Sequence, residues 1–209
     1  MARWGGADFE ELKKLQKRLE EFQKTDVDEF CKAASKELAA RLLALVIPRT
    51  PVGKKPKLEG LKSETVTGAS GKKRSFLTAE GARLEEYWSG YIGGTLRRGW
   101  TAKTHSEAAA GSGKPKISAA AEYAKTLPIE KSGDYYIVRV INPVKYASYV
   151  EFGHRQTPGR FVPALGKRLT QGWVNGRYML TLSEDDLKSI APKVLQNKLD
   201  EMLKEVFGG

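Results

Sequence analysis

The order of helix-forming and strand-forming segments predicts an α+β fold. Amphipathic helical patterns occupy both ends of the chain, whereas β-forming and turn-forming residues are concentrated in residues 94–182. The strand candidates do not alternate with long helices, as they would in a doubly wound fold. We therefore expect a small, mostly antiparallel sheet with a short helix, preceded by a helical hairpin and followed by a C-terminal helix.

The first fifty residues predict that helical hairpin. Asp8 can cap a first helix, and Thr25 or Asp26 can start a second one that Pro48 would end. Only a tight connection separates the two, so we expect them to pack antiparallel. Apolar side chains recur at spacings of three and four in both. They are Phe9, Leu12, Leu15, Leu19 and Phe22, then Val27, Cys31, Ala34, Leu38, Leu42 and Leu45.

Much of the positive charge lies in two segments without steady periodicity. The 209-residue chain carries a formal net charge of +11. Residues 53–74 contain seven Lys and Arg against two Glu, and residues 101–117 contain three Lys against one Glu. Both segments are rich in small, polar and turn-forming residues, which is typical of loops. We expect residues 53–93 to form a long basic insertion loop, with a short helix near residues 78–88.

Two strands are expected before the central motif region. In residues 95–101, Leu96 and Trp100 would share one face of a strand and Arg97 the other. Residues 134–141 are the strongest strand candidate, because β-forming residues fill both faces. Such a strand would be covered twice, by helices or by a neighbouring subunit. The alanine-rich residues 117–127 between them favour a helix but form only a short run.

Residues 142–164 carry the most distinctive pattern. Pro143 suits the first turn of a short helix, and Gly153 suits the left-handed residue that ends one. Three aromatic residues then fall along one side of this helix. They are Tyr146, Tyr149 and Phe152. Core packing is the simpler explanation of these rings. The alternative is a surface that a partner covers, because tyrosine joins a large ring to a polar tip.

A hairpin and a helix are expected at the end of the chain. Asn175-Gly176 favours a type I′ turn, so residues 169–182 should form a β-hairpin. Ser183 and the three acids after it predict a helix start, and Pro192 should kink or split that helix. We expect one structural domain over residues 1–209. Its segments are residues 1–52, 53–93, 94–182 and 183–209.

The sequence offers few groups for catalysis or metal binding. Neither histidine, His105 or His154, belongs to a metal-ligand spacing, and Cys31 has no partner cysteine. No glycine-rich phosphate loop occurs. We therefore expect no catalytic residues, no cofactor, no metal and no small-molecule substrate. A hydrolase in which Glu151 orients His154 is a weaker alternative.

Membrane insertion is not expected, whereas DNA binding is the main rival function. No apolar run approaches the roughly 20 residues of a membrane span, and the N-terminus lacks a signal-peptide core, which predicts synthesis in the cytoplasm. Lysines in a loop can neutralise DNA phosphates without reading sequence, and nearby aromatics can stack on bases. No recognition helix or zinc pattern supports sequence-specific binding. The candidate contacts with DNA, or alternatively with an acidic partner protein, are Lys54, Lys55, Lys57, Lys72, Lys73 and Arg74, with Trp88, Tyr91 and Trp100 for stacking on bases.

A succession of short motifs resembles the neck and tail-completion proteins of tailed bacteriophages. The motifs are Pro51-Val52, Gly94-Thr95-Leu96-Arg97, Val138-Arg139-Val140, Tyr146-Ala147, Val150-Glu151-Phe152-Gly153 and Phe161-Val162-Pro163-Ala164. Each is short, and their order gives the match its specificity. The basic insertion and the hairpin near the C-terminus are additions, and His154 stands where the family often has threonine. Such extended versions resemble components of contractile tails and defective prophages.

The resemblance implies a non-enzymatic virion protein that completes the tail and joins it to the head. It implies a homo-oligomeric ring, expected to be hexameric, that contacts neighbouring neck and tail proteins. Its basic loops could line a passage for DNA through the lumen or meet acidic neighbouring proteins, and the sequence does not choose between the two. The expected location is the neck or head-proximal end of the tail, after assembly in the host cytoplasm. The expected interface or motif residues are Leu96, Arg97, Trp100, Tyr146, Tyr149, Glu151, Phe152, Gly153, His154, Phe161 and Pro163.

Overall fold

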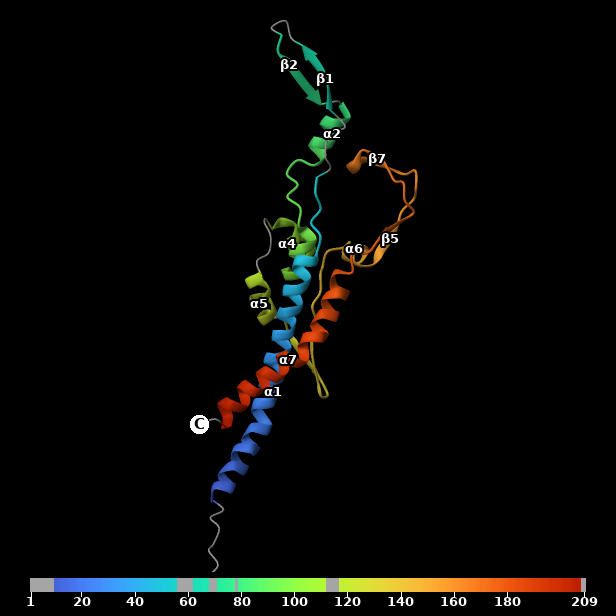
Figure 1. Cartoon of the computed structure of the whole chain (residues 1–209). Coiled ribbons are helices and arrows are strands. Elements are labelled where there is room, and N and C mark those ends of the chain that lie inside the picture. Colours follow the sequence, from blue (N-terminus) through green and yellow to red (C-terminus); the bar gives the residue numbers. More distant parts are fainter. Residues whose placement is uncertain (1–9, 56–61, 68–70, 78, 112–116, 208–209) are drawn as a thin grey trace, which may run out of the picture. The chain divides into compact units, whose positions relative to one another are not determined.

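The computed structural model describes residues 10–55, 62–67, 71–77, 79–111 and 117–207 and confirms the α+β class (Figure 1). Its residues divide into two compact units. Unit 1 comprises Met1–Ala44, Ser118–Val140 and Glu184–Gly209, and unit 2 comprises Leu45–Ile117 and Ile141–Ser183. The expectation of a single structural domain over the whole chain stays a prediction.

One continuous helix, α1 (Glu10–Arg49), stands where a helical hairpin was expected. Thr25 and Asp26 lie inside it, and Pro48 lies in its last turn. The hairpin prediction was wrong because residues that favour a helix cap do not by themselves stop a helix. No glycine or proline precedes Pro48 within α1. Breaking the helix would leave its terminal N–H and C=O groups unpaired, whereas Thr and Asp inside it cost only about 0.7 kcal/mol each.

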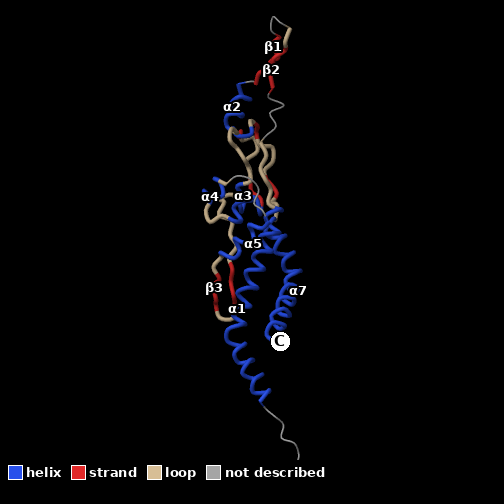
Figure 2. Tube along the Cα trace, turned by 90° about the vertical axis from the view of Figure 1, so that its left-hand side faces the viewer, coloured by secondary structure: helices blue, strands red, loops and turns tan. Residues whose placement is uncertain are grey.

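In unit 1, α5 (Ile117–Thr126) and a hairpin of β3 (Ile129–Ser132) and β4 (Tyr135–Val138) pack against α1. Figure 2 shows this hairpin beside α1. The strand expected in residues 134–141 is confirmed, but one of its faces is open. Tyr135 is 75% exposed and Ile137 is 37% exposed, so the described residues leave this face of the strand uncovered, and its cover by a neighbouring subunit stays a prediction. Alanines 34, 39, 120 and 124 are buried in unit 1.

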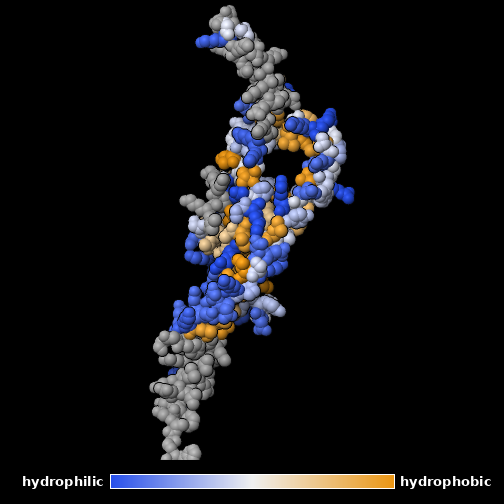
Figure 3. Space-filling view, in the orientation of Figure 1, coloured by the Kyte–Doolittle hydropathy of each residue, from blue (hydrophilic) through white to orange (hydrophobic). Residues whose placement is uncertain are grey.

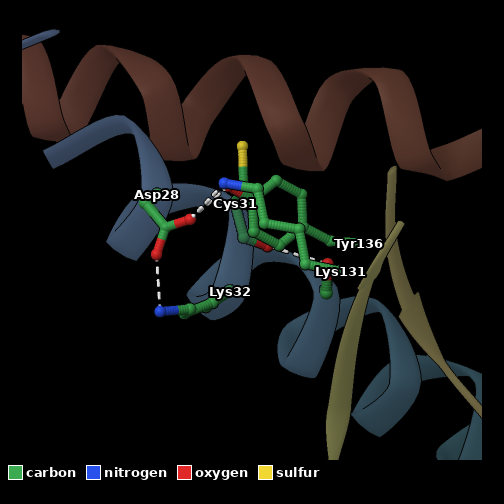
Figure 4. A network of polar contacts seen from close by, with 6 residues as sticks. Asp28, Cys31, Lys32, Lys131 and Tyr136 are labelled. Atoms are coloured by element: carbon green, nitrogen blue, oxygen red, sulfur yellow. Dashed lines mark hydrogen bonds and ion pairs between the residues drawn. The ribbon is translucent and has the colours of Figure 1, made fainter. Parts of the chain in front are cut away.

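A polar network fixes the β3–β4 hairpin to α1 (Figure 4). The Asp28 carboxylate accepts hydrogen bonds from the Lys131 ammonium at 2.8 Å and from the Tyr136 hydroxyl, and Lys32 lies 2.5 Å from its other oxygen. These donors, Lys131 first, hold the pKa of the Asp28 carboxyl well below its ordinary value. The Lys131 ammonium also lies 4.9 Å from the centroid of the Tyr136 ring.

The segment expected as a strand in residues 95–101 is helical. It forms α3 (Thr95–Arg98) and the 3₁₀ turn η2 (Gly99–Thr101). Leu96 and Trp100 are buried together, as expected, but a spacing of four residues places side chains on the same side of both a strand and a helix. Gly94, with φ of 77°, starts the turn. The spacing alone therefore could not distinguish the two structures.

The segments expected as basic loops contain regular structure. In residues 53–93, β1 (Lys62–Thr67) pairs antiparallel with β2 (Lys73–Leu77), followed by α2 (Ala79–Tyr87). The short helix is thus confirmed, whereas the uninterrupted loop was wrong. In residues 101–117, α4 (His105–Ala110) begins where Thr104 Oγ1 accepts a hydrogen bond from the backbone N–H of Glu107 at 3.2 Å.

The rest of unit 2 contains α6 (Ala147–Phe152) and two more antiparallel strand pairs. β5 (Gly153–Arg155) pairs with β8 (Trp173–Asn175), and β6 (Phe161–Val162) pairs with β7 (Lys167–Arg168) around the 3₁₀ turn η3 (Pro163–Leu165). The four pairs in the described ranges are separate two-stranded sheets, not one small sheet.

The hairpin expected across Asn175-Gly176 does not form. Asn175 pairs with Gly153 of β5, and the residues after Tyr178 begin α7 (Met179–Phe207). A Cβ on Gly176 would lie 2.2 Å from the carbonyl oxygen of Glu151, so this glycine serves a close backbone contact and not a tight turn.

The C-terminal helix is confirmed, but it begins four residues before Ser183 and continues past Pro192 without being split. Ser183 is completely buried inside the helix, where its hydroxyl donates to the carbonyl oxygen of Met179 at 2.6 Å. Its side chain therefore does not cap the first turn. The N–H groups at the start of the helix are instead capped by the Glu151 carboxylate.

Candidate assembly surface

Residues from four of the sequence motifs in unit 2 meet around one groove of about 390 Å³, whereas the Phe161–Ala164 motif does not reach it. Four segments far apart in sequence reach it, from Pro51-Val52, the start of α3, α6 and the end of β8. Its lining comprises Pro51, Val52, Gly53, Tyr91, Gly94, Thr95, Leu96, Tyr146, Tyr149, Val150, His154, Val174, Asn175 and Arg177. The groove thus joins motifs that the sequence could only place in order along the chain.

Two of the three aromatic residues at α6, Tyr146 and Tyr149, line the groove, and Phe152 lies outside its lining. Tyr146 is 40% exposed, Tyr149 59% and Phe152 60%. Core packing was therefore the wrong explanation of these rings, and their exposure favours a surface that a partner covers. Partial burial raises the pKa of the Tyr146 phenol, with the nearby Tyr91 phenol as a smaller cause in the same direction.

Glu151 is only 5% exposed, and it caps the start of α7. Its Oε2 accepts a hydrogen bond from the backbone N–H of Leu180 at 2.9 Å. Its Oε1 accepts from the backbone N–H and the hydroxyl of Thr181, at 2.9 and 2.8 Å. A carboxylate at this position satisfies N–H groups that have no partner in the helix and also suits the positive end of the helix dipole.

Gly153 lies where only glycine fits. Its φ of 85° and ψ of 177° form a combination that residues with a side chain rarely adopt. A Cβ would also lie 2.3 Å from the carbonyl oxygen of Val174 and 2.8 Å from the nitrogen of Gly176. The predicted helix exit at Gly153 is confirmed, and the close contact between β5 and β8 adds a second requirement for glycine.

His154 lines the groove beside α6. Its ring centroid lies 5.7 Å from that of Tyr149, and Nε2 lies 3.4 Å from the Gln156 side-chain nitrogen. Nδ1 is buried without a hydrogen-bond partner among the described atoms. Both carboxylate oxygens of Glu151 are held by α7, so this carboxylate does not orient His154 as the hydrolase hypothesis requires.

Three expected interface residues hold the groove in place from inside. Leu96 is 4% exposed and Trp100 2%. The Trp100 indole donates to the Thr50 hydroxyl at 2.7 Å, and the Arg97 guanidinium donates to the carbonyl oxygens of Thr50 and Pro48. The donors from Arg97 satisfy carbonyl groups at the end of α1. These side chains therefore shape the groove rather than cover its surface.

Phe161 and Pro163 are exposed on the β6–β7 hairpin, away from the groove lining. Phe161 is 46% exposed. The hairpin is attached to α2, because the Trp88 indole donates to the carbonyl oxygen of Ala164 at 2.7 Å.

The expected DNA-contact residues are only partly described. Lys54, Lys55 and Lys72 are exposed. Lys73 and Arg74 lie in strand β2 and not in a loop. Lys57 lies outside the described residues. Of the stacking candidates, Trp100 is buried, whereas the Trp88 and Tyr91 rings meet edge to face at 4.7 Å between centroids.

Sequence reasoning missed Asn175 and Arg177, which reach the groove from the segment joining β8 to α7. The Asn-Gly dipeptide was assigned to a turn, and no local signal indicated its pairing with β5. It also missed Thr50, a completely buried residue whose hydroxyl donates to the Val46 carbonyl oxygen while accepting from Trp100. A buried hydroxyl of this kind has no sequence signature.

The described part of the chain contains no group of three or more His, Cys, Asp or Glu side chains placed to hold a metal ion. Among the helices described, none has both the length and the apolar character needed to cross a bilayer.

A groove lined by partly exposed tyrosines, next to a helix with exposed aromatic side chains, is typical of a protein surface that contacts other proteins. Residues 13–153 match the family described as "Bacteriophage HK97-gp10, putative tail-component". This match covers more than half of the chain, so the protein belongs to this family of phage tail components. It confirms the resemblance at the level of a tail component. No curated protein and no solved structure matches the chain significantly.

Proposed function

We propose that this tail component is a non-enzymatic structural subunit that completes the tail and joins it to the head, assembling with copies of itself into a ring at the neck. The observation that carries the proposal is the groove of unit 2. Residues of several motifs between Pro51 and Val150 converge there, and the partly exposed rings of Tyr146 and Tyr149 line it.

The exposed rings at α6 would release free energy if a neighbouring subunit covered them. Tyr146, Tyr149 and Phe152 lie within seven residues of backbone and are each at least 40% exposed, and the same segment contributes to the groove. Full burial of one large apolar side chain is worth about 1.5–3 kcal/mol relative to exposure. A neighbouring subunit that covers this surface would therefore gain substantial binding free energy.

Ring geometry follows from the kind of contact. A contact between two different surfaces of identical subunits closes into a ring when the rotation between copies divides a full turn. A hexamer is expected because phage tails have sixfold symmetry. The ring would lie at the head-proximal end of the tail, in contact with neighbouring neck and tail proteins, after assembly in the host cytoplasm.

The test is to locate the protein in purified particles. Electron microscopy of tails carrying a tagged copy should show the tag as a ring at the head-proximal end. Absence of the chain from purified virions and tail-like particles would overturn the proposal. So would a labelled position along the tail shaft or at its distal end.

A second candidate function, sequence-independent DNA contact, is favoured by the exposed lysines Lys54, Lys55 and Lys72. Replacing all three with glutamine should weaken retention on duplex DNA and reduce the slope of log affinity against log salt by about 0.9 for each lost phosphate contact. Glutamine at the exposed Lys188, Lys193 and Lys204 of α7 is the matched control. Unchanged retention by the first variant would remove DNA contact by these lysines.

A further inference from the structure

The net positive charge of the chain lies entirely in unit 2. Unit 2 contains 20 Lys and Arg against 7 Asp and Glu, a net charge of +13. Unit 1 contains 16 against 18, a net charge of −2. Unit 2 is thus strongly basic, whereas unit 1 is slightly acidic. The excess of positive charge on unit 2 favours binding to an acidic partner.

The β6–β7 hairpin combines this charge with exposed apolar side chains. Phe161 is 46% exposed and Leu165 43%, and the cations Arg160, Lys167 and Arg168 are exposed around them. The sequence contains no acidic residue from 152 to 183 that could neutralise them locally. Figure 3 shows apolar surface bordered by hydrophilic surface at this hairpin. We call these five residues the hairpin tip.

Unit 1 contains a groove with the complementary character, between α1 and the C-terminal part of α7. Phe30, Ala33 and Met202 provide its apolar lining, in a volume of about 350 Å³. Three carboxylates, Glu29, Glu201 and Glu205, also line it. The one cation in the lining, Lys198, lies 3.2 Å from the Glu37 carboxylate and is therefore already paired. We call this the acidic groove.

We propose that the hairpin tip of one copy docks in the acidic groove of a second copy. Phe161 and Leu165 would cover Phe30 and Met202, while the three cations of the tip face the three carboxylates. Such an arrangement, an apolar centre within a complementary charged rim, is that of specific protein interfaces. The proposal rests on the proposed self-assembly and adds the surfaces by which it occurs.

The chemistry favours a second copy over DNA as the occupant. Phosphates would need the cations but not the phenylalanine and leucine between them. The acidic groove would repel DNA, yet it matches the tip in both charge and apolar content. Because tip and groove are different surfaces, each copy uses one of each, and the contact is of the heterologous kind that builds rings.

Carbodiimide cross-linking tests the contact directly, because it joins a lysine amine to a nearby carboxylate without a spacer. The concentrated full chain would be mixed from equal parts of ¹⁴N-labelled and ¹⁵N-labelled protein. We expect mixed-isotope peptides that link Lys167 to Glu201 or Glu205. Links of Lys167 only within one chain, links only to other sites, or no mixed links at all would overturn the proposal.

Charge reversal provides the second measurement. Glu201→Lys with Glu205→Lys, or Arg160→Glu with Lys167→Glu, should each weaken self-association by about tenfold or more, and all four changes in one chain should restore it. Glu85→Lys with Glu86→Lys, at exposed positions of α2, is the matched control and should have little effect. Weakening by the basic-side pair alone, together with lost DNA retention, would assign the tip to DNA and overturn the proposal.

The outcome is distinguishable from failure of the proposed function. A chain found as a ring at the neck, with its cross-links elsewhere, would remove this contact and leave the tail-completion role standing. A chain absent from tails would remove that role whatever its cross-links.

Discussion

The two units differ in how their charges and polar groups are satisfied. In unit 1, ion pairs link neighbouring elements or successive helical turns, as in Asp28 with Lys131, Glu37 with Arg41 and Glu130 with Arg139. In unit 2, side chains mostly bind backbone groups of distant segments, as Arg97, Trp88 and Glu151 do. Several carboxylates of unit 1 thus have partners within the unit, whereas the cations of unit 2 greatly outnumber its acids. This contrast is the basis for proposing an acidic partner for unit 2.

The largest expected effect is on the close contact in unit 2. Gly153→Val would force a Cβ to within 2.3 Å of the Val174 carbonyl oxygen and would also strain a backbone with φ of 85°. We expect a loss of about 3 kcal/mol of unfolding free energy, measured by chemical denaturation, with lower solubility.

Gly159→Val is the control for that change. Its φ is 82°, but no atom lies within 4 Å of its Cβ position. It should cost about 1–2 kcal/mol, from the backbone alone. Equal stability of the two variants would show that the contact between β5 and β8 does not require Gly153.

The second effect concerns the helix cap. Glu151→Gln removes the charge that accepts the N–H groups of Leu180 and Thr181, so we expect a loss of about 1–2 kcal/mol and faster hydrogen exchange at these two amides. Glu184→Gln removes an exposed charge of the same helix and should change stability by less than about 0.5 kcal/mol. Unaltered exchange in the first variant would contradict the cap.

The third effect is a pH dependence in unit 1. The folded pKa of Asp28 lies below its unfolded value, so its network stabilises the fold above the ordinary pKa of about 4 and the benefit is lost as the pH falls towards the folded pKa. Asp28→Asn should lower the Tm at pH 7, and the gap to the native chain should narrow below about pH 4. Asp134→Asn, at an exposed position of the hairpin turn, should leave the profile unchanged. A gap independent of pH would exclude the ionised network.

The smallest effect on folding is expected at the aromatic surface, where the effect on assembly should be large. Tyr149→Ala with Phe152→Ala should change the unfolding free energy by about 0.5 kcal/mol or less per residue, since both rings are exposed. Incorporation into tails, measured by quantitative mass spectrometry of purified particles, should fall sharply. Tyr135→Ala, at a more exposed ring of unit 1, should be incorporated normally. Normal incorporation of the double variant would show that the exposed rings of α6 are not needed for assembly.

The parts of the fold that depend on local pattern were predictable. The helix exit at Gly153, the strand at Tyr135–Val138 and the C-terminal helix follow from residues close together in sequence. The wrong predictions share a cause. A local sequence pattern is compatible with more than one conformation and with more than one strand partner. The spacing of Leu96 and Trp100 suits either a strand or a helix. Asn175 pairs with Gly153, a strand partner far from it in the sequence.

The sequence predicted several residues of the candidate site, but it did not predict what each of them does there. The sequence placed Tyr146, Tyr149 and Phe152 together, but periodicity shows a shared side and not whether that side faces the core or solvent. Glu151 was assigned to a motif without a partner, because its partners are backbone N–H groups that every residue type except proline supplies. Only the folded chain reveals such a contact.

The Glu151 cap has a consequence for how the chain's C-terminal part can change. The family match ends at residue 153, whereas α7 begins at Met179. Backbone amides are chemically the same in any helix, so the two backbone contacts of Glu151 require no particular side chain at the start of α7, and only its third contact is with a side chain, the Thr181 hydroxyl. A changed sequence at the start of α7 would therefore keep this starting point as long as the buried positions of Met179 and Ser183 are still filled.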